Sequence, residues 1–115
     1  MPAPSASSPP TAAALRAHHD WLESNGKKGR RLDKRNANCS GLDLTGENLA
    51  QARFVGANFR NAKLIGVDFT EADLSGANLA GTVLTGTYLN NANLARANLD
   101  KADLAQATLP DANLR

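Results

Sequence analysis

A large apolar residue returns at every fifth position along most of this chain. Ala stands two positions before it in eleven of sixteen repeats, and Asn or Asp stands one position before it in eleven. Gly follows two positions after it in seven of the fifteen complete repeats. The sixteen central positions are the predicted structural core, and they hold Cys39, Leu44, Leu49, Phe54, Phe59, Leu64, Phe69, Leu74, Leu79, Leu84, Leu89, Leu94, Leu99, Leu104, Leu109 and Leu114.

A period of five fits neither a regular helix nor a flat strand. On an α-helix each step of five turns the position by about 140°, which would spread the leucines around the whole cylinder. In a flat strand an odd spacing would place successive leucines on opposite faces. Gly after the central residue and Asn or Asp before it are typical of turns. We therefore predict that the chain bends once per repeat and stacks as a solenoid, whose coils bury their apolar faces against one another.

The repeats resemble those of the pentapeptide-repeat family. Units such as Ala72-Asp73-Leu74-Ser75-Gly76 and Ala77-Asn78-Leu79 have the form A(N/D)LxG, and the resemblance covers residues 37–115. It implies an all-β solenoid: a right-handed, four-sided parallel β-helix of about four coils, with the central residue and the residue two before it pointing inward. A column at spacing twenty agrees with four repeats per coil: Asn38, Asn58, Asn78 and Asn98.

The residues ahead of the repeats divide into three segments. Residues 1–10 contain four Pro and three Ser and are predicted to be a disordered tail. Residues 11–26 are predicted to form a capping helix whose docking face holds Ala14, Leu15, His18, Trp21 and Leu22. A helix this short needs a surface to pack on, and the open first coil provides one. We expect Leu15, Trp21 and Leu22 to form the cap contact, with the last two substantially buried.

Residues 27–36 form a predicted basic connector between the cap and the repeats. Its six cations are the candidate anion-binding residues: Lys27, Lys28, Arg30, Arg31, Lys34 and Arg35. Such a run is attracted to phosphate on nucleic acid or on an anionic membrane, but it is more often a solvated connector. No aromatic residue is interleaved for base stacking.

The sequence contains no evident catalytic, cofactor-binding or metal-binding constellation. Cys39 is the single cysteine, occupies an inward position and is interpreted as structural. His18 and His19 are about 100° apart on a helix and cannot share one metal ion from that spacing. His19 and Glu23 lie one turn apart, but no third or fourth ligand accompanies them. We therefore predict a non-enzymatic protein without a cofactor.

The predicted function is that of a binding or scaffolding module, a rigid solenoid that presents side chains to a protein partner. Ile65, Val83 and Tyr88 are the outward apolar or aromatic positions where contact is expected. The family resemblance adds an alternative, a DNA mimic that binds DNA gyrase. The repeats disfavour it, because they carry six basic and eight acidic residues and are nearly neutral. Targeting to anionic membrane or nucleic acid through the connector is the other alternative.

Two further expectations concern assembly and location. The repeat pattern runs to Leu114-Arg115 without a covering element, so we expect an exposed apolar end and a homodimer formed through the C-terminal coil. The family resemblance also implies a bacterial, cytoplasmic protein.

Overall fold

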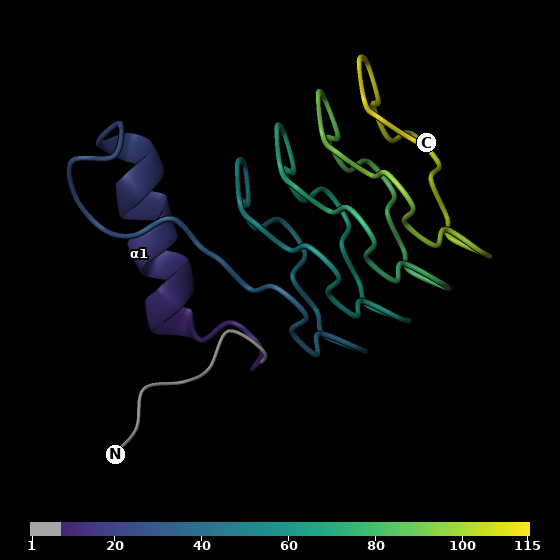
Figure 1. The fold of residues 1–115 in the computed structure, drawn as a ribbon, viewed down its shortest axis with the longest axis horizontal. Helices are drawn as coiled ribbons and strands as arrows, with labels where there is room; N and C mark the ends of the chain where they lie inside the picture. Colours follow the sequence, from purple (N-terminus) through teal and green to yellow (C-terminus); the bar gives the residue numbers. More distant parts are fainter. Residues whose placement is uncertain (1–7) are drawn as a thin grey trace.

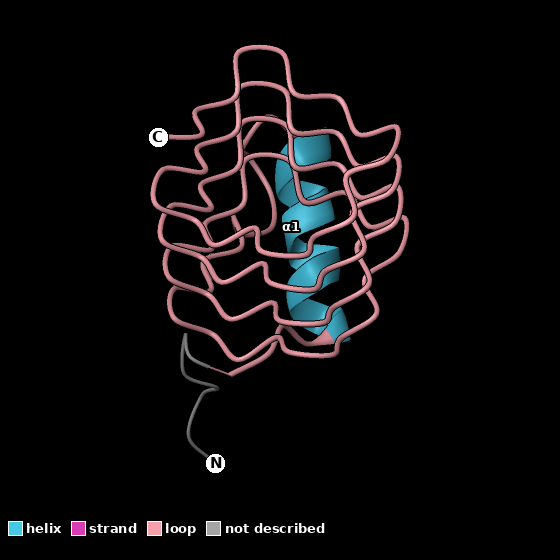
Figure 2. Ribbon diagram, turned by 90° about the vertical axis from the view of Figure 1, so that its right-hand side faces the viewer, coloured by secondary structure: helices cyan, strands magenta, loops and turns pink. Residues whose placement is uncertain are grey.

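The described part of the protein consists of one α-helix and a stack of coils (Figure 1). The computed structural model describes residues 8–115, so most of the predicted tail lies outside the described residues. Helix α1 spans Ala12–Glu23 and lies across one end of the stack, while the chain ends at the other (Figure 1). Seen along the stack, α1 runs behind the outline of the coils (Figure 2). The helix therefore covers the N-terminal end of the solenoid.

Helix α1 is shorter than the segment predicted for it, and its ends have clear causes. Thr11 is the N-cap, and its hydroxyl oxygen accepts from the Ala14 N–H at 3.1 Å. At the other end Asn25 and Gly26 both have positive φ, at 54° and 86°, which a continuing helix does not allow. The helix therefore begins one residue after the start of the predicted segment 11–26 and ends three residues before its end.

The coils are joined by parallel β-bridges between residues twenty positions apart. Four columns of bridges begin at Asp33, Asn38, Asp43 and Asn48, which gives four repeats per coil. From Arg53 onward, each bridge residue uses both its N–H and its carbonyl to hydrogen-bond the coil before it, and, except in the last coil, its two chain neighbours bond the coil after it. Asn78, for example, donates to Ala57 O at 2.9 Å, and its own carbonyl accepts from the Phe59 N–H at 2.8 Å. Within residues 8–115 these are isolated bridges rather than strands, because the chain turns again inside every repeat.

The corners explain the Asn and Asp of the pattern. Each of the eleven Asn or Asp residues before a central position accepts, through Oδ1, the N–H two residues later. The residue two after the central position has positive φ in every repeat, which is why Gly is frequent there. At Gly56 and Gly81 space adds a second reason, since a Cβ would lie 2.3 Å from Oδ1 of Asn36 and of Asn61.

The central residues fill the interior of the solenoid. All twelve from Cys39 to Leu94 are buried. The rings of Phe54, Phe59 and Phe69 pack edge to face with centroids 4.9–6.2 Å apart. Burial then declines in the last coil, and Leu114 is 56% exposed. The apolar interior is therefore closed at the helix end and open at the other end of the described chain.

The solenoid begins one repeat earlier than the sequence indicated. Asp33 bridges to Arg53, with Leu32 and Lys34 inward at 4% and 7% exposure and Asn36 at a corner with φ of 57°. Residues 32–36, assigned above to the basic connector, thus form a pentapeptide unit. A Lys at the central position hid this unit from a search for apolar periodicity. The connector proper is residues 27–31.

Candidate functional site

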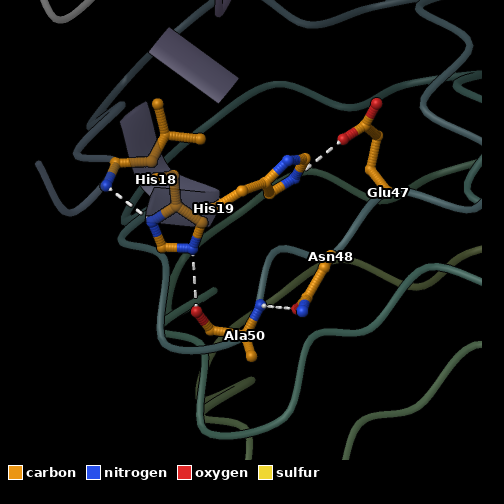
Figure 3. Close-up of polar contacts among 6 residues, drawn as sticks. His18, His19, Glu47, Asn48 and Ala50 are labelled. Atoms are coloured by element: carbon orange, nitrogen blue, oxygen red, sulfur yellow. Dashed lines mark hydrogen bonds and ion pairs between the residues drawn. The ribbon is translucent and has the colours of Figure 1, made fainter. Parts of the chain in front are cut away.

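His18 attaches α1 to the first coil. Its side chain is fully buried, Nδ1 accepts from the Leu32 N–H at 2.9 Å, and Nε2 lies 2.9 Å from Ala50 O (Figure 3). A backbone N–H can only donate and a carbonyl can only accept, so the ring must be neutral with its proton on Nε2. Burial lowers the pKa of His18; the bond to Ala50 opposes this effect, and nearby His19 and Arg31 add to it.

The neighbouring side chain makes a second contact with the first coil. His19 Nε2 lies 3.2 Å from Glu47 Oε2, outside hydrogen-bond alignment (Figure 3). Glu47 stands where most repeats have Ala, which marks it in the sequence as a contact residue for the cap. Within residues 8–115 no three His, Cys, Asp or Glu side chains are placed to hold a metal ion.

A histidine, rather than an apolar residue, is the fully buried side chain of the cap. Leu15, Trp21 and Leu22 are each partly buried, and Leu15, with Ala14, packs against the core. The Trp21 ring stacks on His18 with centroids 5.9 Å apart, and the Arg31 guanidinium lies 5.5 Å from its centroid. Helix α1 is rotated so that a histidine, rather than the indole, faces the coil, because two backbone groups there require a polar partner.

Gly29 allows the connector to lie directly on the backbone of α1. The Arg30 N–H donates to Ala17 O at 3.0 Å. A Cβ at residue 29 would lie 2.1 Å from that same Ala17 oxygen, and Gly29 has φ of 72°. The backbone of the connector is thereby held beside the helix.

A groove between α1 and the connector gathers four of the six candidate anion-binding residues. It has a volume of about 630 Å³ and is lined by Thr11, Ala13, Ala14, Ala17, Arg30, Arg31, Leu32, Asp33, Lys34 and Arg35. Lys27 and Lys28 are not among the lining residues. A second groove of about 330 Å³ borders α1 through His19, Leu22 and Glu23 and is lined by Glu47 on the coil. The structure therefore places four of the six predicted anion-binding residues together in the first groove and leaves Lys27 and Lys28 outside it.

Cys39 has the environment of a structural residue. It is fully buried in the first coil, and burial raises the pKa of its thiol to about 11, while the nearby Lys34 slightly opposes this effect. The thiol is therefore neutral near pH 7 and inaccessible.

The outer faces of the solenoid differ in charge. Between residues 37 and 115, the repeats of the Asp43 and Asn48 columns hold one cation, Lys63, and six acidic residues: Asp43, Glu47, Asp68, Glu71, Asp103 and Asp111. We call these two faces the acidic side. The repeats of the other two columns hold Asp73 and Asp100 against five cations: Arg53, Arg60, Arg96, Lys101 and Arg115. The near-neutral total conceals this separation.

Two large apolar side chains are exposed on the acidic side. Ile65 is 39% exposed and lies in a repeat of the Asp43 column, and Tyr88 is 50% exposed in the Asn48 column. Val83, the third predicted contact position, is half-buried. In the described chain the remaining large apolar residue with comparable exposure is Leu114, in the last coil.

Comparison with known families identifies the repeats. The family model described as Pentapeptide repeats matches residues 37–76 and 77–115, in eight copies. The chain belongs to the pentapeptide-repeat family. The match confirms the resemblance drawn from the A(N/D)LxG units, and it leaves the cap and the connector outside the matched residues. No curated protein matches this pentapeptide-repeat protein.

Solved structures include similar pentapeptide-repeat proteins. Protein alr5209 from Nostoc PCC 7120 is 29% identical with a TM-score of 0.59, and the match covers 92% of this chain and 99% of that one. QnrB1, a plasmid-mediated fluoroquinolone resistance protein, is 20% identical with a TM-score of 0.54, over 65% of this chain and 38% of its own. A thylakoid-lumen protein of Arabidopsis thaliana is 31% identical with a TM-score of 0.40, over 67% and 57%. The fold is thus shared with alr5209 and QnrB1.

Among the described residues of this pentapeptide-repeat protein, no helix is long and apolar enough to cross a membrane.

Proposed function

We propose that this protein is a non-enzymatic binding or scaffolding module that presents a rigid surface to a protein partner. Its scaffold would be a right-handed, four-sided β-helix of about four coils. The observation that carries the proposal is the exposure of Ile65 and Tyr88 on adjacent faces of the acidic side. Aromatic side chains are enriched at the centres of protein interfaces, where they contribute much of the binding energy.

The two exposed side chains flank one corner of the solenoid. Ile65 directly precedes Gly66, and Tyr88 follows Gly86 by two residues; these two glycines and Gly46 occupy the same corner in successive coils. At all three glycines a Cβ would meet nothing within 4 Å, so the corner is open. A partner could therefore contact both side chains at once. The surrounding carboxylates favour a partner with a basic surface.

The alternative of a gyrase-binding DNA mimic is less well supported. Such a mimic needs dense negative charge around much of its surface. Here the carboxylates are concentrated on one side, and the opposite side carries a net positive charge. The likeness to QnrB1, at 20% identity, concerns the fold alone. Targeting to nucleic acid or membrane through the connector is also less well supported, because four of its six candidate cations line a groove.

We further propose a homodimer through the last coil and a bacterial, cytoplasmic location. Leu99, Leu104 and Leu109 are half-buried, and Leu114 is exposed, so a second copy could cover this apolar end. Light scattering at micromolar concentration tests the dimer. The proposal predicts twice the monomer mass, and a monomer that persists on concentration would contradict it.

Affinity measurements on face variants test the binding function. Once a partner is captured, the double variant Ile65→Ser/Tyr88→Ser should weaken its binding about tenfold or more. The control Val55→Ser/Arg60→Ser removes an apolar and a polar side chain from the basic side and should change the affinity less than about twofold. Equal losses in the two variants would show that the acidic side is not the interface.

A further inference from the structure

The groove beside the first half of α1 is lined by both cationic and apolar side chains. Arg30, Arg31, Lys34 and Arg35 provide the cations, and Ala13, Ala14, Ala17 and Leu32 provide the apolar part of the lining, which we call the alanine floor. Asp33 is the one carboxylate among the lining residues, and its Oδ1 lies 3.2 Å from Arg35 Nε. The lining side chains thus carry a net charge of +3.

Two of these cations are held inside the groove rather than displayed on its surface. Lys34 is 7% exposed because it occupies the inward position of the first repeat, with Nζ 3.4 Å from Ser8 Oγ. Arg31 is fixed by its Nε donating to Gln51 O and by stacking on Trp21. Burial chiefly lowers the pKa of Arg31; the nearby Arg53 adds to this effect, and Asp33 and Asp73 oppose it. A bound anion would compensate the charge of this partly buried guanidinium.

The size of the groove selects the kind of anion. A volume of about 630 Å³ lies within the range of about 300–1,000 Å³ for small-molecule sites. A duplex or a membrane surface would reach the exposed Arg30 and Arg35 but not the buried Lys34. Arginine forks match phosphate oxygens in pairs. We propose that this groove binds the phosphate group of a small phosphorylated molecule, with the apolar part on the alanine floor.

A matched pair of charge variants tests the inference. Phenyl phosphate and inorganic phosphate are titrated into the full chain by calorimetry at fixed ionic strength, and binding should be tighter for the ester because of the alanine floor. Arg30→Gln/Arg35→Gln should weaken binding of phenyl phosphate about tenfold or more. Lys27→Gln/Lys28→Gln removes the same charge from the same connector, outside the groove, and should change it less than about twofold.

Two further arms test the competing ligands. Vesicles containing phosphatidic acid test a membrane surface, and single-stranded DNA tests a nucleic acid; both reach Arg30 and Arg35 but not Lys34. Binding of phenyl phosphate that only the Arg30→Gln/Arg35→Gln pair weakens supports the site. Equal losses in both pairs, no binding of phenyl phosphate, or binding of vesicles or DNA alone would overturn the inference. Trp21 emission reports whether the cap stays docked in each variant. Because the groove is separate from Ile65 and Tyr88, this result is independent of the proposed partner surface.

Discussion

Replacement of His18 by Phe should release the capping helix from the solenoid. Phenylalanine keeps a planar ring at this position but removes both nitrogens. The Leu32 N–H and the Ala50 carbonyl, each 2.9 Å from the imidazole, would lose their partner. An unpaired buried polar group costs about 1–3 kcal/mol, so two such groups destabilise the docked cap by roughly 2–6 kcal/mol.

The pH dependence of docking follows from the same two bonds. Because the folded-state pKa of His18 lies below its ordinary value of 6.5, the undocked cap binds the proton more tightly than the docked cap. Docking is therefore most stable above about pH 6.5 and weakens as the pH falls below it, by up to about 1.4 kcal/mol per pH unit. The loss levels off once the pH is below the folded-state pKa.

Trp21 fluorescence during urea unfolding at pH 8 and pH 5 measures this effect, because the indole stacks on His18. A His19→Gln background removes the imidazole that contacts Glu47, so that the measured pH dependence reports on His18. In that background the midpoint of the Trp21 transition should fall at pH 5, and the additional His18→Phe change should lower it at pH 8 and abolish most of the pH dependence. Equal midpoints at pH 8 and pH 5 in the presence of His18 would refute the assignment of Nδ1 as an acceptor.

Three further predictions concern the solenoid and its connector. Leu79→Asp buries an unpaired carboxylate and should prevent folding. Asn90→Asp can still accept from the Thr108 hydroxyl and should barely change the midpoint of thermal unfolding. Equal midpoints for the two variants would contradict the five-residue register. Gly29→Ala should lower the midpoint more than Gly86→Ala, because both have positive φ but only the first Cβ would clash, at 2.1 Å from Ala17 O. Cys39 should not react with a thiol reagent at pH 8 until the protein is unfolded in urea, and rapid labelling of the native protein would be inconsistent with its burial and a thiol pKa of about 11.

The solenoid could be predicted from the sequence because its repeats are simple. With one apolar position in five and turn residues around it, only a bend in every repeat keeps all the apolar residues on the inside. The central residues from Cys39 to Leu94 are indeed buried. The first unit was missed because Lys34 occupies its inward position. At the end of a stack a long cation can fill an inward position, since no further coil packs on it.

The attachment of the cap was harder to predict. His18 lies on the docking face that helical spacing indicates, but spacing does not reveal that Leu32 and Ala50 would each present a backbone group to it. These partners come from two segments that meet only after the first coil has formed. The division of the basic residues likewise depends on Gly29, which places Arg30 and Arg31 beside α1. Glu47 was the one sign of the cap contact in the sequence, because it stands at a position where most repeats have Ala.

Site-specific photo-crosslinking tests the central claim, that the acidic side is the protein-binding surface. A photoreactive amino acid is introduced separately at positions 65 and 88 and, for comparison, at the basic-side positions 60 and 96, all of which are exposed. After irradiation in cells, crosslinked products are identified by mass spectrometry. We predict that positions 65 and 88 capture the same protein and that positions 60 and 96 do not. Capture of one partner only from positions 60 and 96, or of the same set of proteins from all four positions, would contradict this account.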